Sequence, residues 1–370
     1  MCLSHTVEGH CFHAAAESSS GMVRILSADA VGELLSLAEL FPVVEEAFVK
    51  QGRGEVERPP RPHFPVGIDI DRVRDGTNGN GVAGAGTETR SGSEPTEQDG
   101  PLGTGLTMPA YIHGREVYAT KLAAVHPENC AHGLPTVNAQ VVLTDATTGL
   151  PLALLDGTTI TSARTGCIGG LAAESLGTDP VRLGVLGAGA QARWQSRAIA
   201  VGSAVESVNV YSPSDSREAC AADLREDGIP AEAVDSPEAA VSGANVVVTA
   251  TTSETPVFDG SWLDPGTLVV AVGAYTPETR ELDAETFERA ARVFADVPEE
   301  VADIGDVRGA GIDESDLLPL SAVFEGDAGR ESDDEILVVE SVGSAVLDAA
   351  TAEYLYEKSN ARGVGEEVGL

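Results

Sequence analysis

The chain has 370 residues, 42% of them hydrophobic, which is enough for one large or two ordinary domains with a sizeable core. Its 59 acidic residues outnumber its 23 basic residues, and the formal net charge of −36 argues against nucleic acid or an anionic membrane as partner. We interpret the acidity as adaptation to a salt-filled cytoplasm, because molar salt shortens the screening length to about 3 Å. A specific cationic partner is the alternative. Only three basic residues are lysines, and one of these, Lys121, lies in an apolar run.

The ends and the cysteines indicate a cytoplasmic protein. The five cysteines are scattered and include no Cys-x-x-Cys pair, which is typical of a reducing compartment. No apolar run reaches the roughly 18 residues of a membrane span, and no secretory signal is recognisable. Residues 1–21 hold two cysteines and three histidines without a standard zinc spacing. We therefore predict a disordered leader with the functional start at Met22, rather than a metal site.

Residues 22–165 read as a first domain of mixed α and β structure. A short strand at 23–27 precedes a helix with Leu34, Leu35, Ala38 and Phe41 at helical spacing. An extended proline-rich stretch follows at 56–67. Residues 69–104 are rich in Gly, Ser, Thr and acid, which predicts a mobile surface insertion. Alternating runs at 106–112, 116–125 and 136–157 predict an antiparallel sheet, and residues 158–177 predict a helix that ends at Gly177.

Residues 166–335 have a different rhythm. Short β-rich runs, separated by segments of helix length, predict a parallel sheet with crossover helices; they lie at 181–186, 207–212, 245–251 and 267–273. Residues 336–370 include a helical stretch with Gly363 as its expected cap. We expect this last segment to return to the first domain.

A glycine-rich turn follows the first of these runs. Gly187 and Gly189 stand directly between a predicted strand and a predicted helix, and Ala192 takes the third small position of a G-x-G-x-x-A pattern. Gly187 would permit the tight turn, Gly189 would let the backbone approach a pyrophosphate, and Ala192 would allow close helix packing. The phosphates would lie at the helix N-terminus. We predict dinucleotide binding; a plain structural turn is the alternative.

The end of the next strand bears on the choice of cofactor. A carboxylate there would accept hydrogen bonds from the adenosine ribose and favour NAD, but the sequence has Ser212, with Arg217 nearby. A serine removes the charge that repels a 2′-phosphate, and an arginine can pair with it. We predict NAD or NADP as cofactor, with NADP slightly favoured. The alternative is that Asp215 binds the ribose.

Five stretches appear together in order: "KLAAVHPENCAHGLPTV", "LTDATTGLPLALLDGTTITSARTG", "GVLGAGAQA", "AVGAYTPETREL" and "ESVGSA". Together they resemble the ornithine cyclodeaminase and mu-crystallin family, which also includes archaeal alanine dehydrogenases and imine reductases. The resemblance implies an α/β fold with a Rossmann-type dinucleotide-binding domain and a discontinuous α+β domain for substrate and dimerisation. It also implies a homodimer.

The resemblance also assigns roles to residues. Arg61 and Lys121 would grip a substrate carboxylate, and Lys121 and Arg164 would act at the reacting centre. The resemblance gives as cofactor contacts Thr136, Arg164, Gly187, Gly189, Ala190, Gln191, Ser341 and Gly343; we add Ser212 and Arg217 from the end of the second parallel strand, and Thr251. The chemistry agrees, because a guanidinium gives a two-pronged grip and an ammonium gives a point charge that also influences proton transfer. The structural alternatives are a surface arginine at 61, a helix-face ion pair at 164 and a strand lysine facing water at 121.

One position departs from the family pattern. The cyclodeaminases carry a catalytic aspartate where this chain has Tyr275. A phenol is a poor base at neutral pH, although it can donate a hydrogen bond or a proton, and in that role we predict Tyr275 as a catalytic residue together with Lys121 and Arg164. Glu278 and Glu281 are nearby carboxylates, and for Glu281 a structural role is favoured.

We therefore predict an NAD(P)-dependent oxidoreductase that transfers hydride at the α-carbon of a small amino or imino acid, of the alanine dehydrogenase or imine reductase type. Ornithine cyclodeaminase, which forms proline and ammonia, is the first alternative. A non-catalytic, NADPH-loaded binding protein is the second.

Overall fold

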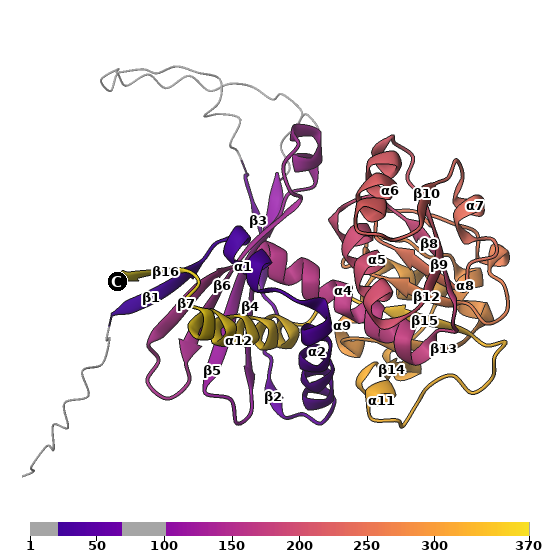
Figure 1. The fold of residues 1–370 in the computed structure, drawn as a ribbon. Helices are drawn as coiled ribbons and strands as arrows, with labels where there is room; N and C mark the ends of the chain where they lie inside the picture. The colour runs from indigo at the N-terminus through magenta and orange to yellow at the C-terminus, as the bar shows by residue number, and fades with distance from the viewer. Residues whose placement is uncertain (1–20, 69–100, 370) are drawn as a thin grey trace, which may run out of the picture.

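The structure, a computed structural model, describes residues 21–68 and 101–369 (Figure 1). The predicted leader therefore lies almost entirely outside the described residues, as does the predicted insertion up to residue 100. Residues 103 and 104, assigned to that insertion, instead begin strand β4. Two eight-stranded sheets organise the described chain.

The first sheet is mixed. Its β1–β7 pair is parallel and its other pairs are antiparallel. The predicted antiparallel strands are confirmed as β4 to β7. The strand order is β16 (Glu366–Gly369), β1 (Met22–Leu26), β7 (Pro151–Asp156), β6 (Val137–Asp145), β5 (Val117–Val125), β4 (Gly103–Ile112) and β2 (Val56–Glu57), with β3 (His63–Val66) also on β4.

Helices cover one face of this sheet (Figure 1). They are α1 (Ala28–Leu34), α2 (Leu37–Gly52), α4 (Gly157–Leu176) and α12 (Ala345–Arg362), with a short 3-10 helix η1 (Pro127–His132) after β5. The prediction of one helix through Leu34, Leu35, Ala38 and Phe41 was wrong, because Leu35 has an extended backbone that ends α1. The apolar faces of α1 and α2 can therefore pack against the core in two different directions, which one continuous helix could not do.

The second sheet is parallel throughout, as predicted. Its order, with the first strand between the second and the fourth, is that of a Rossmann fold. The strands are β10 (Ala231–Ala233), β9 (Val205–Tyr211), β8 (Val181–Leu186), β11 (Val246–Thr249), β12 (Leu268–Ala271), β15 (Ile336–Glu340), β13 (Ala290–Ala295) and β14 (Leu317–Pro319). The accompanying helices are α5 (Ala190–Gly202), α6 (Ser216–Glu226), α7 (Pro237–Val241), η2 (Gly260–Trp262), α8 (Ala284–Arg289), α9 (Pro298–Val301), α10 (Gly305–Ala310), η3 (Glu314–Asp316) and α11 (Ser321–Phe324).

The connections between the sheets differ from the predicted boundaries. The boundary placed between residues 165 and 166 falls inside α4, which is continuous. The Asp156 side chain caps α4 by accepting from Thr159 N at 2.9 Å, and Gly177 follows its last turn as predicted. The boundary placed at 335/336 is wrong, because β15 pairs with β12 and β13 in the parallel sheet. The returning segment therefore starts after Glu340.

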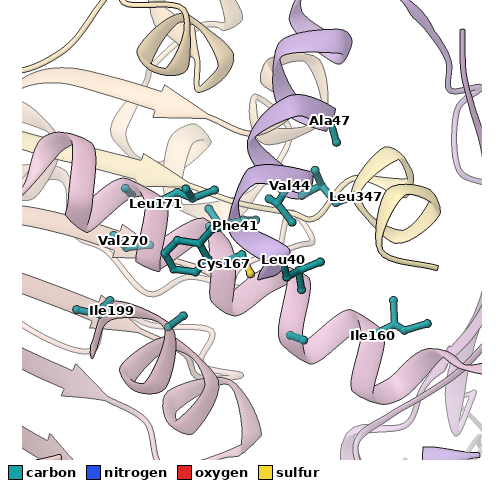
Figure 2. Close-up of a cluster of buried hydrophobic side chains, with 14 of the residues drawn as sticks. Leu40, Phe41, Val44, Ala47, Ile160, Cys167, Leu171, Ile199, Val270 and Leu347 are labelled. Carbon is teal, nitrogen blue, oxygen red and sulfur yellow. The ribbon is translucent and has the colours of Figure 1, made fainter. Parts of the chain in front are cut away.

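A continuous apolar core joins the two halves. Figure 2 shows Leu40, Phe41 and Val44 of α2 beside α4. Side chains of α5, β12 and α12 belong to the same buried cluster, among them Ile199, Val270 and Leu347. Because α4 and α12 pack into this core, the charged side chains that they carry are held in fixed positions between the sheets.

Candidate functional site

The turn after β8 has the geometry that dinucleotide binding requires. Gly187 has φ +114°, a conformation that L side chains rarely adopt. A Cβ at this position would lie 2.4 Å from the carbonyl oxygen of Ala250 and 3.3 Å from a methyl carbon of Thr251. The Gly187 N–H donates to the Tyr211 carbonyl at 2.8 Å, which ties the turn to the end of β9. Only glycine fits this turn.

The start of α5 offers free backbone donors. Gly189 is the N-cap and provides no side-chain cap, so the first N–H groups, from Ala190 onward, have no side-chain acceptor. The Gln191 Oε1 atom is buried and has no hydrogen-bond partner among the described residues. The free N–H donors at this uncapped helix N-terminus fit a pyrophosphate, whose oxygens accept hydrogen bonds. The residues present at this turn are therefore compatible with NAD or NADP.

Three serine hydroxyls cluster after β9. The Ser214 and Ser216 hydroxyls lie 2.7 Å apart, and Ser212 Oγ lies 3.3 Å from Ser216 Oγ. Arg217 Nη1 donates to the Ser212 carbonyl at 3.0 Å, while the buried Arg217 Nε has no partner among the described residues. Asp215 begins α6 without a side-chain capping bond. This end of the strand thus presents hydroxyls and a guanidinium.

The loops after β11 and β12 are tied together by Glu281. This fully buried carboxylate accepts from the Thr251 N–H at 2.6 Å, from the Gly273 N–H at 2.8 Å and from the Thr249 hydroxyl at 2.8 Å. Burial raises the pKa of Glu281 to about 7 despite these bonds. Glu281 holds the loop that bears Thr251 beside the glycine turn, which is the structural role favoured for it.

Tyr275 follows β12 and is 38% exposed. Its N–H donates to the Thr279 hydroxyl at 2.9 Å, and burial raises the pKa of the phenol above its ordinary value. Within residues 21–68 and 101–369 no bond or ion pair joins its side chain to Lys121 or Arg164. A phenol with a raised pKa is even less suited to act as a base at neutral pH.

Lys121 lies on the inner face of β5. Its strand neighbours are the buried Met108 and Val141, and its own side chain is 3% exposed. The ammonium Nζ lies 2.6 Å from Asp348 Oδ2 and 3.4 Å from Thr161 Oγ1. The predicted lysine therefore faces the interior, and the alternative of a strand lysine facing water is wrong.

Asp348 joins the two predicted cations of the site. It lies in the first turn of α12 and is 1% exposed, and its Oδ1 accepts from Arg164 Nε of α4 at 3.0 Å. Burial opposes its charge, but Arg164 and Lys121 outweigh this and hold the pKa of Asp348 below its usual range. A pair of buried cations thus shares one carboxylate, and the group carries one net positive charge.

The pKa of Lys121 is lowered from 10.5 to about 8. Burial is the main cause, the charge of Asp348 opposes it, and the charges of Arg164 and Arg61 lower the pKa further. The ammonium therefore exists at neutral pH but gives up its proton far more readily than an exposed lysine. A ligand that carries both an anionic group and a basic nitrogen could bind to this group by its charge and take a proton from Lys121.

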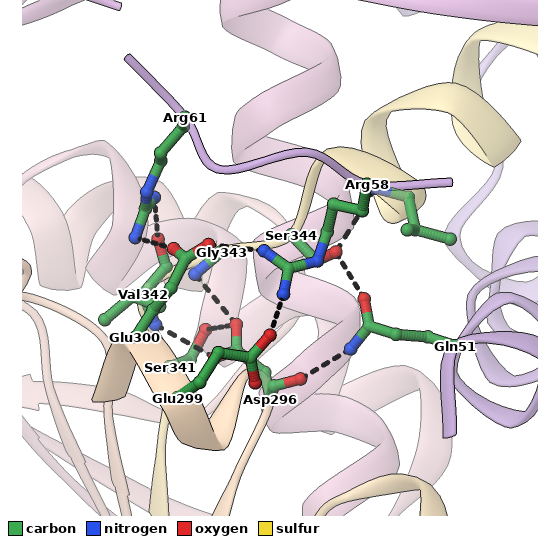
Figure 3. A network of polar contacts seen from close by, with 11 residues as sticks. Gln51, Arg58, Arg61, Asp296, Glu299, Glu300, Ser341, Val342, Gly343 and Ser344 are labelled. Carbon is green, nitrogen blue, oxygen red and sulfur yellow. Dashed lines mark hydrogen bonds and ion pairs between the residues drawn. The ribbon is translucent and has the colours of Figure 1, made fainter. Parts of the chain in front are cut away.

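The loop between β15 and α12 is held over the site by Asp296, which follows β13. The Asp296 carboxylate accepts from the Ser341 hydroxyl at 2.7 Å, from Gly343 N at 2.8 Å and from Val342 N at 3.1 Å (Figure 3). Gly343 has φ +83°, and a Cβ there would lie 2.7 Å from an Arg164 Nη atom. The loop therefore lies directly against the Arg164 guanidinium.

Arg61 reaches the same loop from the proline-rich segment. Its Nη1 donates to the Val342 carbonyl at 3.0 Å, and its Nη2 forms an ion pair with Glu300 of α9 (Figure 3). It is therefore engaged on both Nη groups, and the surface-arginine alternative does not describe it. Thr136 precedes β6, is half-buried, and accepts at its carbonyl from His126 N at 2.8 Å.

Sequence reasoning missed three carboxylates: Asp348, Asp296 and Glu300. Asp348 had a usable signal, since it is the only charged residue between Ser344 and Ala352, in the stretch SAVLDAATA. The same logic singled out Lys121. Asp296 and Glu300 stand in an acidic chain without such a contrast.

No group of His, Cys, Asp and Glu with the arrangement of a metal site occurs among the described residues. Nor does the part of the chain that the structure describes contain a helix that could cross a membrane.

Several known proteins are similar to this chain in sequence and in fold. The chain is 36% identical to a Δ1-pyrroline-2-carboxylate reductase of Bacillus cereus strain ZK / E33L, over 275 residues that cover 72% of this chain and 84% of that protein. The structure of Thermococcus litoralis Δ1-pyrroline-2-carboxylate reductase in complex with NADH and L-proline superposes with a TM-score of 0.81, at 31% identity, covering 94% of this chain and all of that one. An archaeal alanine dehydrogenase dimer with bound NAD gives 0.79 at 29% identity, covering 94% and 99%.

The sequence profile of the ornithine cyclodeaminase/mu-crystallin family matches residues 70–363. This range includes the glycine turn, Lys121, Arg164 and the loop before α12. The chain therefore belongs to the ornithine cyclodeaminase/mu-crystallin family.

Proposed function

We propose that this protein is an NAD(P)-dependent oxidoreductase that interconverts a small α-imino acid and the corresponding α-amino acid. The observation that carries the proposal is the buried group formed by Lys121, Asp348 and Arg164, beside a loop that leads from the nucleotide-binding sheet. Such a group suits a substrate that is an anion at one end and accepts or loses a proton at a neighbouring nitrogen. An α-imino acid has both features.

The residues divide the chemistry between them. Arg61 and Lys121 hold the carboxylate, and Arg164, fixed by Asp348, presents its Nη groups under Gly343. A bound nicotinamide supplies a hydride to the carbon of the C=N bond. The nitrogen then takes one proton, which Lys121 provides because its pKa is about 8, and solvent restores it. Oxidation of an amino acid runs through the same steps in reverse and gives the imino acid; deamination needs one further step, in which water hydrolyses the C=N bond to a keto acid and ammonia.

Among imino acids we propose a cyclic five-membered one, Δ1-pyrroline-2-carboxylate, as the first substrate to assay. Two reductases with this activity in their names are similar to the chain, and the solved one contains L-proline. Alanine and its keto acid with ammonia are the second choice, given the similar alanine dehydrogenase. Cyclodeamination is disfavoured, because Tyr275 is partly exposed and its phenol, whose pKa is raised by burial, is a poor base at neutral pH.

The deciding experiment is a spectrophotometric screen at 340 nm, at low and at molar KCl. It pairs NADH and NADPH with Δ1-pyrroline-2-carboxylate and with pyruvate plus ammonia and, in the other direction, NAD+ and NADP+ with proline and alanine. Net oxidation of the reduced cofactor by an imino acid supports the proposal. Ammonia released from ornithine without net cofactor change would establish a cyclodeaminase instead. Cofactor binding without any turnover would establish a binding protein.

We propose further that NADPH is accepted. The support is that among the described residues no carboxylate contacts the hydroxyls of Ser212, Ser214 and Ser216, and that the buried Nε of Arg217 has no partner there, while Arg217 Nη2 lies 3.4 Å from Asp235 Oδ1. An Arg217→Ala variant should raise KM for NADPH by about tenfold and leave KM for NADH near the wild-type value, because the arginine would bind only the 2′-phosphate. Equal effects on both cofactors would contradict this assignment.

A second copy of the chain is the proposed partner. The face of the first sheet that its helices do not cover carries Tyr118, Leu122 and Leu154, which are 36%, 44% and 37% exposed. Strand register places them on one face, since Leu122 pairs with Gln140 and Val142 pairs with Leu154. Neighbouring apolar side chains on an open sheet face are typical of a subunit interface.

A further inference from the structure

Two arginines of the proline-rich segment meet two glutamates of α9. Arg58 forms ion pairs with both Glu299 and Glu300, and Arg61 forms one with Glu300. Figure 3 shows this group beside the loop that contains Val342 and Gly343. The group is electrically neutral, with two positive and two negative charges, and it connects the first half of the chain to the nucleotide-binding half.

Glu300 is the centre of this group. Its Oε1 pairs with Arg58 Nη1 and its Oε2 with Arg61 Nη2, so one carboxylate bridges two guanidinium groups. In the structure, Glu300 thus takes the kind of contact with Arg61 that a substrate carboxylate would take. We propose that Glu300 is a displaceable internal counter-ion of Arg61, which a substrate carboxylate replaces and which Arg58 then retains.

The charges and exposures indicate how the exchange can occur. A fifth charge, that of the substrate, would leave the neutral group with an excess carboxylate unless one carboxylate moves to water. Glu299 is best placed to do so, because its side chain is 55% exposed while that of Glu300 is 19% exposed. Once Glu299 leaves, Arg58 has free donors for Glu300, and Arg61 has a free Nη2 for the substrate. Exposed ion pairs are weak, so this release costs little.

The exchange makes Glu300 a specificity-determining residue. An imine that has no carboxylate cannot replace Glu300 on Arg61. The group of two arginines and two glutamates would stay neutral and would give such an imine no electrostatic attraction. A substrate with a carboxylate restores the two-to-two balance when Glu299 moves out. The inference rests on the proposed function, in which Arg61 holds the substrate carboxylate.

Three variants test the exchange: Glu300→Gln, Arg58→Gln and, as matched control, Glu299→Gln, which removes the same charge from the same helix. The affinity for L-proline is measured by calorimetry with saturating NADH. Glu300→Gln should lower Kd about fivefold, because the competing charge is gone, and Arg58→Gln should raise it about fivefold, because Glu300 then pairs with Arg61 alone. Glu299→Gln should change Kd less than about twofold, since this pair is exposed.

In the imine reduction assay the Glu300→Gln change should appear in KM, with kcat within about twofold of the wild type, because the contact is lost before the chemical step. Circular dichroism confirms that each variant is folded. If wild type binds L-proline and reduces the imine but Glu300→Gln binds no more tightly, the exchange is refuted while the proposed function stands. If neither wild type nor Glu300→Gln binds L-proline or turns over an imino acid, both fail.

Discussion

Asp348→Asn is the most informative single change in the site. It removes one negative charge, keeps the shape of the side chain, and leaves the Lys121 ammonium and the Arg164 guanidinium without their shared partner. Breaking a buried ion pair by neutralising one partner costs about 3–5 kcal/mol, because the remaining charge stays buried. With an unfolding entropy of about 2.1 cal/mol/K per residue, a chain of 370 residues loses about 1.3 °C of Tm per kcal/mol, so we expect a fall in Tm of about 4–6 °C.

The loss should depend on pH with a defined sign. The folded-state pKa of Lys121 is about 8, below the 10.5 of an exposed lysine, so the unfolded chain binds more protons between these values. This group's contribution to stability therefore rises as the pH increases from about 8 to 10.5. Without Asp348, the opposing charge that supports the ammonium is missing, and Lys121 should lose its proton at lower pH. The stability difference between variant and wild type should accordingly be larger at pH 7 than at pH 9.

Thermal unfolding at pH 7 gives the change in Tm, and urea denaturation at pH 7 and pH 9 gives the pH dependence of the free energy of unfolding, both in molar KCl. Glu357→Gln is the control, because Glu357 is an exposed acid on the same helix. Imine reduction should fall at least tenfold in kcat/KM, since Lys121 and Arg164 lose their fixed positions. A variant with wild-type Tm and wild-type kcat/KM would show that Asp348 neither supports the cations nor orders the site.

Three further predictions concern separate parts of the molecule. Lys121→Arg should keep the positive charge but lower kcat of imine reduction and remove its alkaline decline near pH 8, because a guanidinium neither gives up its proton nor titrates there; a decline that persists would belong to another group. Gly187→Ala should weaken NADH binding about tenfold in a fluorescence titration, since its φ of +114° and the nearby Ala250 carbonyl leave no room for a Cβ; an unchanged Kd would refute this. Leu122→Asp should convert a dimer to a monomer in sedimentation experiments, whereas a dimer that persists would place the interface elsewhere.

The fold was predictable because its signals are local. Alternation of apolar residues gave β4 to β7, and short β-rich runs with crossover segments gave the parallel strands. The errors arose where contacts with distant parts of the chain determine where an element ends or which sheet it joins. Leu34 and Leu35 have helical spacing, yet the chain ends α1 between them so that α2 can pack in another direction. The run that forms β15 resembles any buried strand, and only its neighbours β12 and β13 assign it to the second sheet.

The candidate site was predictable in its cations, whereas among its carboxylates only Asp348 has a local signal, as the one charged residue of its apolar stretch. Arginine is recognisable within a family motif, whereas one acid among 59 carries little information. Asp348 meets Arg164 across 184 residues of sequence, and Arg61 meets Val342 across 281. No local pattern encodes such distances. Glu300 could not have been selected over Glu299, because only the orientation of α9 distinguishes them.

The rarity of lysine is a weaker argument for function than burial. Lys50 and Lys358 are the other two lysines of the chain. Each forms an ion pair with a partly exposed glutamate, Glu55 and Glu39 respectively. These pairs are of the kind that contributes little to stability. Lys121 differs in that its strand neighbours are apolar and its side chain is 3% exposed, so its charge persists only because Asp348 supports it. Burial of the Lys121 ammonium carries a free-energy cost of desolvation, so a specific requirement for a positive charge at this position is implied. A substrate that has a carboxylate beside an imine nitrogen would explain that requirement.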